Sequence, residues 1–342
     1  MAYFKKLDLE LENLLKLLNK QQRWLIIINP DPDALASAMA LKRILSRRVE
    51  SVGIAMTSEV KRPDNLAMIH YLHIPVNKLT PVLTAQFDKF ALVDSQPHHN
   101  KQFSQFSFSI VVDHHPISKD NPVNADFIDI RPDYGATSTI FTEYLYNLRL
   151  RPGKHLSTAL LYGIKTDTHS FEQSFNDADI KAFRYLSKFA DPLILRKIVR
   201  SEFKIEWLKY FLQALKKMRL MKEGISVYMG DVDSPDVLVI LADFFMKVHD
   251  VSWDMISGVC DGKLIIIFRS DGIKRDVGKL AAKLFADFGK AGGHKTMARA
   301  EIPLENIKIH PQQFIWERLK KSKIINKILP SINGSNSNNG ED

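Results

Sequence analysis

The chain has 342 residues, of which 45% are hydrophobic, and this is enough for about two globular domains with a core each. The single cysteine, Cys260, excludes an internal disulfide and a cysteine-based zinc cluster. The net charge of +9 favours an anionic partner such as a nucleotide or nucleic acid, although many soluble proteins are mildly basic.

The first segments in chain order predict an N-terminal helix and no membrane anchor. Leucines recur at helical spacing between residues 7 and 20, and this amphipathic helix could pack on the body or form a homodimer with a second copy. Acidic residues occur where a signal peptide has its apolar core. No run approaches the roughly 18 apolar residues of a membrane helix, so we expect a cytoplasmic protein without a membrane partner.

The next part of the chain alternates between strands and helices. Continuous apolar runs predict buried strands, and segments with helical periodicity follow them. This alternation predicts a doubly wound, largely parallel α/β sheet. The predicted strands are 24–28, 52–56, 90–93, 108–112 and 127–130, and the predicted helices are 34–46, 63–72, 136–146 and 155–164.

The second half predicts a smaller α/β domain behind a helical connector. Residues 177–221 have a helical pattern throughout, whereas the later segments mix strands (226–229, 251–259, 264–268) with helices (236–247, 277–288). The last residues are rich in Asn, Ser and Gly and should be disordered. We therefore expect an N-terminal helix (1–21), a first domain (22–190), a connector (191–221), a second domain (222–329) and a tail (330–342).

Four segments of the first domain carry acids at the end of a strand or helix. In open α/β sheets, ligands bind beyond the carboxyl ends of the strands, so these segments can converge on one crevice. Any one of them alone could be a helix cap or an ordinary loop. Together, carboxylates and imidazoles suit Mn²⁺ or Mg²⁺, and a pair of such ions can brace a phosphate. The segments contain Asp31-Pro-Asp33, Asp94, Asp113-His114-His115 and Asp167.

These four segments resemble motifs I to IV of the DHH superfamily, in the expected order. That superfamily includes RecJ-type exonucleases, nanoRNases with phosphoadenosine-phosphate phosphatase activity, cyclic-dinucleotide phosphodiesterases and class II pyrophosphatases. The resemblance implies up to two divalent ions, preferably Mn²⁺ with Mg²⁺ as the alternative. It implies that Asp113 and His115 are catalytic, with His115 contacting the phosphate, and that Asp94 bridges both ions. The implied metal ligands are Asp31, Asp33, Asp94, His114 and Asp167.

A further resemblance lies in the C-terminal half, to the DHH-associated domain with its glycine-rich substrate loop. Adjacent glycines let backbone N–H groups approach a phosphate, and an arginine offers it a planar fork. Together the two resemblances cover about residues 22–305 and imply an active site in the cleft between the domains. The implied substrate-binding residues are Arg269, Ser270, Gly292, Gly293 and His294.

Two positions depart from the family pattern. Ile27 stands where motif I usually has a histidine, so we expect one tight and one weak metal site. Arg299 stands where a small residue usually follows the glycine loop, which bears on the substrate class.

The resemblance implies hydrolysis of short oligonucleotides or of small nucleotides such as phosphoadenosine phosphate. Two alternatives remain open. One is hydrolysis of inorganic pyrophosphate or polyphosphate, although the pyrophosphatases have a different C-terminal domain. The other is a non-catalytic, nucleotide-binding regulator that lost a metal with the change at Ile27.

Overall fold

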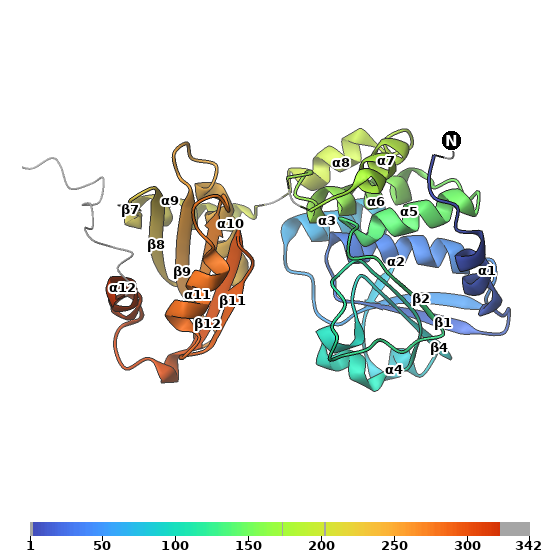
Figure 1. Ribbon diagram of the computed structural model, residues 1–342, viewed down its shortest axis with the longest axis horizontal. Coiled ribbons are helices and arrows are strands. Elements are labelled where there is room, and N and C mark those ends of the chain that lie inside the picture. Colours follow the sequence, from blue (N-terminus) through green and yellow to red (C-terminus); the bar gives the residue numbers. More distant parts are fainter. Residues whose placement is uncertain (1–2, 173, 202, 322–342) are drawn as a thin grey trace, which may run out of the picture. The chain divides into compact units, whose positions relative to one another are not determined.

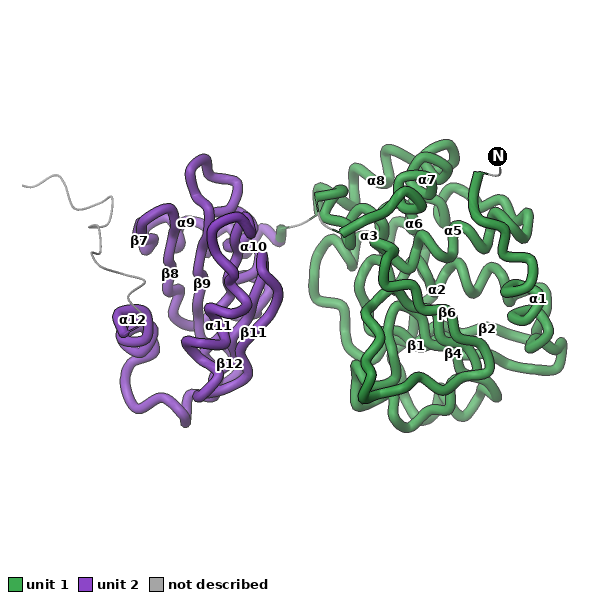
Figure 2. Tube along the Cα trace, viewed as in Figure 1, with its two compact units in different colours: residues 1–203 green, residues 204–342 purple. Residues whose placement is uncertain are grey.

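The computed structural model describes residues 3–172, 174–201 and 203–321. It divides into two compact units, unit 1 (residues 1–203) and unit 2 (residues 204–342), shown in Figure 2. The predicted connector is shared between them, because helix α8 (Pro192–Val199) belongs to unit 1 and helix α9 (Leu208–Lys217) to unit 2. The predicted disordered tail lies outside the described residues.

Unit 1 contains a six-stranded sheet in which every neighbouring pair is parallel. Its strand order is β3-β2-β1-β4-β5-β6, so the chain reverses direction across the sheet between β1 and β4 (Figure 1). The central strands are apolar along their length because both of their faces are covered. The strands are β1 (Arg23–Ile28), β2 (Ser51–Met56), β3 (Val76–Lys78), β4 (Lys89–Val93), β5 (Phe108–Asp113) and β6 (Phe127–Ile130).

The two faces of this sheet are covered differently. Ile26 and Ile28 belong to a core shared with the longer helices, whereas Leu25 and Ile27 belong to a second core with residues of α4 and η2. The predicted parallel α/β architecture is therefore confirmed. The helices of unit 1 are α1 (Asp8–Lys16), α2 (Pro32–Leu45), α3 (Pro63–Leu72), α4 (Pro81–Thr84), η1 (Pro97–His99), η2 (Lys101–Gln105), α5 (Thr137–Asn147), α6 (Lys154–Asp167), α7 (Asp177–Leu186) and α8 (Pro192–Val199).

The N-terminal helix α1 packs on its own unit. Leu7, Leu11 and Leu14 are buried in the helical core of unit 1. The apolar face of α1 therefore packs on the body of its own chain, which is one of the two partners expected for it; the other was a second copy of the chain.

Unit 2 is a smaller α/β unit, as predicted. Its six-stranded sheet has the order β11-β12-β10-β9-β8-β7 and is antiparallel except for the pair β8–β9. Helices α9 and α10 cover one face, and α11 and α12 cover the other. The elements are η3 (Ile205–Trp207), α9 (Leu208–Lys217), β7 (Arg219–Met221), β8 (Gly224–Asp231), α10 (Pro235–Phe245), β9 (Trp253–Cys260), β10 (Lys263–Ser270), α11 (Val277–Phe285), β11 (Lys290–Gly293), β12 (Met297–Pro303), η4 (Leu304–Asn306) and α12 (Pro311–Lys321).

Two expectations for this half need correction. Residues 219–221 form strand β7 rather than the end of a helix, because they pair with β8. Gly292 and Gly293 end the short edge strand β11 rather than lying in a loop. Sequence periodicity missed both strands because each is short and is defined by its partner. In the described parts of the chain, every helix is too short or too polar to cross a lipid bilayer.

Candidate active site

The candidate site lies at the carboxyl ends of the central strands of unit 1. Asp94 follows β4 directly, Asp113 is the last residue of β5, and Asp33 stands in the first turn of α2, the helix after β1. Asp167 is the last residue of α6. The reversal of strand order between β1 and β4 is the kind of position where open α/β sheets bind their ligands.

Four predicted metal ligands meet there. One ligand atom from each of Asp33, Asp94, His114 and Asp167 lies within 4.8 Å of the other three. His114 Nε2 is 3.1 Å from Asp167 Oδ2 and 3.6 Å from Asp94 Oδ1. Carboxylates this close repel one another unless a proton or a cation lies among them.

Asp33 is fixed by the N-terminus of α5. The backbone N–H groups of Thr137 and Ser138 donate to its two carboxylate oxygens at 2.6 and 2.8 Å. These groups belong to the first turn of a helix, where backbone donors have no partner within the helix. Burial, followed by the charge of Asp167, raises the pKa of Asp33 to about 6.

Asp94 has one carboxylate oxygen that accepts a hydrogen bond and one that has no hydrogen-bond donor among the described residues. Thr137 Oγ1 donates to Oδ1 at 2.8 Å, whereas Oδ2 is buried without a hydrogen-bond partner among the described residues. The backbone of Asp94 is left-handed, with φ of 58°. Burial, and then the charges of Asp33 and Asp31, raise its pKa well above the ordinary value. A buried oxygen without a donor, among further carboxylates, fits a bound cation.

The ring orientation of His114 also fits a cation. Its Nδ1 lies 3.1 Å from the carbonyl oxygen of Tyr134, so this nitrogen donates and Nε2 faces the carboxylates. Burial lowers the pKa of His114, but the close approach of Asp167 Oδ2 to Nε2 and the charges of Asp33 and Asp167 outweigh it and raise the pKa to about 9. The surroundings of Nε2 therefore favour positive charge. Three carboxylates and one imidazole form a donor set suited to Mg²⁺ or Mn²⁺.

Asp113 is placed to orient His115. It is fully buried, with Oδ1 2.8 Å from His115 Nδ1 and Oδ2 accepting a 2.8 Å hydrogen bond from Gln96 Nε2. The His115 side chain is 43% exposed. It is therefore accessible beside the candidate metal ligands Asp33, Asp94, His114 and Asp167, which we call the metal-ligand cluster. The hydrogen bond to Asp113 and the charge of that carboxylate raise the pKa of His115.

Asp31 lies outside the four-residue cluster and caps α2, and its role as a metal ligand stays a prediction. Its Oδ1 accepts a 2.8 Å hydrogen bond from the backbone N–H of Ala34. Burial, followed by the charge of Asp167, raises its pKa to about 7, so it still belongs to the same group of interacting acids. Ile27 is fully buried in the core on the other face of the sheet, beside Leu92 and Phe103.

Several residues of this site were not predicted from the sequence. His99 lies beside His115 with ring centroids 5.4 Å apart, and its Nδ1 accepts a hydrogen bond from the backbone of Gln96. The pair His98-His99 shortly after β4 was the available signal. Thr137 and Ser138 support Asp33 and Asp94, and the run of small residues from Gly135 to Thr139 was the signal for a close approach of backbone to carboxylate.

The predicted substrate-binding residues lie together at one end of the sheet in unit 2. Arg269 Nε is 2.7 Å from Asp243 Oδ1, and the register places Arg269 opposite Asp254, whose buried oxygens have no hydrogen-bond partner among the described residues. The Ser270 hydroxyl lies 3.0 Å from the carbonyl oxygen of Arg275 and 3.2 Å from that of Lys295, so it holds the loop after β10. Ser270 therefore stabilises the loop conformation at the end of the sheet where Arg269 and the glycines lie.

The glycine pair needs both of its glycines. Gly292 and Gly293 have φ values of 157° and 149°, and a Cβ on Gly293 would lie 2.5 Å from the carbonyl oxygen of Met297. His294 follows with an exposed side chain, and Arg299 pairs with Gly292 across the β11–β12 ladder. The arginine that departs from the family pattern is thus a direct neighbour of the glycines.

A comparison of the sequence with known proteins finds a relative of moderate identity. The uncharacterized protein MJ1633 of Methanocaldococcus jannaschii is 32% identical over 306 residues, which cover 89% of this chain and 63% of that protein. The chain therefore spans less than two thirds of that relative's length.

Two solved structures share the fold at low identity. An exopolyphosphatase-related protein from Bacteroides fragilis has a TM-score of 0.70 and 16% identity, with 92% of this chain and 95% of that chain covered. RecJ from Thermus thermophilus in complex with Mn²⁺ has a TM-score of 0.50 and 14% identity, with 96% of this chain and 56% of that chain covered.

Family comparison agrees with the resemblance seen in the motifs. The family described as "DHH family, N-terminal domain" matches residues 25–164, which include most of β1, all of β4 and β5, and most of α6. Residues 25–164 are therefore similar to the N-terminal domain of the DHH family.

Proposed function

We propose that this protein is a metal-dependent phosphoesterase that hydrolyses phosphoester bonds in short oligonucleotides or small nucleotides. The observation that carries the proposal is the convergence of Asp33, Asp94, His114 and Asp167, with the buried Oδ2 of Asp94 left without a donor. The substrate class agrees with a nanoRNase or phosphoadenosine-phosphate phosphatase.

The four clustered residues would hold the metal, with Asp31 as a further acid beside them. A divalent ion supplies a water of lowered pKa and neutralises charge on a phosphoryl group. Thr137 and Ser138 keep Asp33 and Asp94 in place, and Tyr134 fixes the tautomer of His114. His115, oriented by Asp113, would donate a hydrogen bond to a substrate phosphate oxygen.

Unit 2 would supply the substrate contacts. Arg269 offers a guanidinium to a phosphate, and its ion pair with Asp243 restricts its orientation. Gly292 and Gly293 present backbone without side chains, and the exposed His294 follows them. The preferred ion in this proposal is Mn²⁺, with Mg²⁺ as the alternative, because the ligand set combines carboxylates with imidazole.

A product-release screen tests the proposal. Purified protein with Mn²⁺ is incubated with a diribonucleotide, phosphoadenosine phosphate, a cyclic dinucleotide, pyrophosphate or polyphosphate. We expect turnover of the diribonucleotide or of phosphoadenosine phosphate, and loss of that turnover in Asp94→Asn. Turnover of pyrophosphate or polyphosphate alone would contradict the proposed substrate class. No turnover of any substrate by protein shown to bind Mn²⁺ would contradict the proposed activity.

A further inference from the structure

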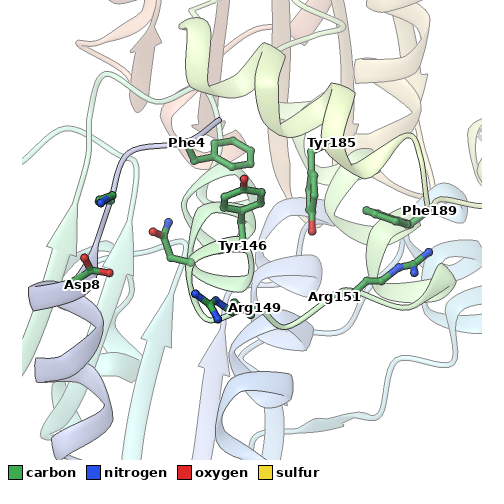
Figure 3. Close-up of a pocket in the computed structure, with 9 residues that line it drawn as sticks. Phe4, Asp8, Tyr146, Arg149, Arg151, Tyr185 and Phe189 are labelled. Carbon is green, nitrogen blue, oxygen red and sulfur yellow. The ribbon is translucent and has the colours of Figure 1, made fainter. Parts of the chain in front are cut away.

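Unit 1 has a cavity whose lining contains none of the residues of the metal-ligand cluster. It has a volume of about 750 Å³ and is lined by the segment before α1, the C-terminal end of α5, the loop after it, and α7 with the turn that follows (Figure 3). This volume is within the range of small-molecule sites in proteins. The lining combines aromatic rings with cationic side chains.

The aromatic part is formed by three rings in mutual contact. The centroids of Phe4, Tyr146 and Tyr185 are 5.1 to 5.9 Å apart, with edge-to-face geometry for each pair. Tyr146 is 38% exposed, so its ring is accessible from the cavity. Accessible aromatic rings of this kind are the surfaces on which proteins stack nucleobases.

The charged part is mainly basic. Lys6, Arg149 and Arg151 are exposed and line the cavity, and Asp8 is the one acid in its lining. Among the described residues, no carboxylate is within ion-pair distance of these three cations. Arg151 instead lies over the ring of Phe189 at 4.6 Å. Their charge is therefore available to a ligand, and guanidinium groups bind phosphate through two parallel hydrogen bonds.

The cavity and the metal-ligand cluster are at opposite ends of the same two helices. Helix α5 begins at Thr137, which contacts Asp33 and Asp94, and ends near Tyr146 in the cavity lining. Helix α6 ends at Asp167 and begins shortly after Arg151. Their 11 and 14 residues separate the two sites by roughly 16 to 21 Å at 1.5 Å per residue. One nucleotide cannot occupy both.

We infer that this cavity is a nucleotide-binding site separate from the metal-ligand cluster, in which a base stacks on the exposed ring of Tyr146, beside Tyr185, and the attached phosphate binds Arg149 and Arg151. The ligand is either a free nucleotide or one nucleotide unit of a longer single strand. The inference goes beyond the proposed hydrolysis and does not require it, because the cavity contains none of the metal-ligand cluster.

The test is equilibrium binding in the presence of a chelator, so that metal-dependent turnover does not occur. Fluorescently labelled adenosine monophosphate and a labelled single-stranded oligoribonucleotide are titrated with wild type, Arg149→Ala/Arg151→Ala, Tyr146→Leu and Tyr146→Phe. The control is Arg47→Ala/Arg200→Ala, which removes two exposed arginines of unit 1 that do not line the cavity. Thermal melting establishes that each variant is folded.

We expect the Arg149/Arg151 variant and Tyr146→Leu to bind about tenfold more weakly, and Tyr146→Phe and the control to bind like wild type. Weaker binding of both ligands identifies a site open to free nucleotides. Weaker binding of the oligoribonucleotide alone identifies a site for a strand. Equal losses in the control and the Arg149/Arg151 variant would overturn the inference, because they would reflect net charge. Competition by inorganic pyrophosphate as strong as that by adenosine monophosphate would also overturn it, by showing a site for anions without a base.

Discussion

Gly163 on α6 lies directly against Asp33 on α2. A Cβ atom at Gly163 would be 3.0 Å from Oδ1 of Asp33 and 2.5 Å from Oγ of Ser138. The absence of a side chain therefore lets α6 approach α2 closely enough for Asp167, at the end of α6, to join the cluster.

Gly163→Ala should weaken metal binding. The added methyl group must displace Asp33 or Ser138, so we expect Mn²⁺ to bind about tenfold more weakly and stability to fall by about 1 to 3 kcal/mol. Calorimetric titration and thermal melting measure the two effects. Gly153→Ala is the matched control, because Gly153 precedes the same helix and a Cβ there meets nothing within 4 Å. Equal metal affinity in both variants would show that the contact with Asp33 is unimportant.

The sequence predicted the main elements of unit 1 well because its central strands are buried on both faces and its outer strands β2 and β6 are still short, mostly apolar runs. The predicted strand 127–130 and helix 63–72 agree with β6 and α3 at both ends. Strand order could not be predicted, because it depends on pairing between distant segments. The short strand β3 was missed for the same reason.

Site residues that directly follow a strand could be predicted from the sequence. Site residues that act through a contact between two distant elements could not. Asp94 and His114 follow β4 and β5, so their proximity follows from the parallel sheet. The roles of Thr137, His99 and Gly163 depend on where helices and loops return to those strand ends. No local sequence pattern contains that information.

The metal-free protein should lose stability as pH rises through the neutral range. Asp31 and Asp33 have pKa values raised from 3.8 to about 7 and about 6, and His114 has its pKa raised from 6.5 to about 9. Between the ordinary and the raised pKa, each group holds a proton in the folded state that the unfolded state has released. The free energy of unfolding therefore falls as pH rises, by the linkage between proton binding and folding.

Thermal melting of metal-free protein between about pH 5 and pH 8 measures this effect. We expect the melting temperature to fall across the range, and added Mn²⁺ to raise it more at the alkaline end, because the cation competes with these protons. A melting temperature that rises with pH in the absence of metal would contradict the assignment of the raised pKa values.

We expect the protein to bind two Mn²⁺ ions with unequal affinity, because Ile27 stands where the resembling family has a histidine. The aliphatic side chain of Ile27 cannot coordinate a cation, and it is fully buried. We expect calorimetric titration with Mn²⁺ to show one tight and one weak site in the wild type, and a stronger weak site in Ile27→His. Leu25→His is the control, because Leu25 lies in the same strand and the same buried core. Two equally tight sites in the wild type would show that another residue completes the coordination.

Substrate contacts in unit 2 should be separable from metal binding in unit 1. Arg269→Ala and His294→Ala should each raise KM for a nucleotidic substrate about tenfold, because each removes a phosphate or substrate contact, while Mn²⁺ affinity stays unchanged. Lys263→Ala is the control, since Lys263 is a half-exposed cation at the other end of β10. Loss of Mn²⁺ affinity in either test variant would contradict this division of roles.

The most direct test of the metal-dependent mechanism is product release from a diribonucleotide or phosphoadenosine phosphate by protein stripped of metal and then supplied with Mn²⁺. Asp94→Asn removes charge from the residue whose buried oxygen lacks a donor, while keeping its size and a partner for Thr137. We predict no turnover without metal, full recovery with Mn²⁺ in the wild type, and a loss of at least about a thousandfold in Asp94→Asn. Turnover that persists after chelation, or wild-type turnover in Asp94→Asn, would contradict the account.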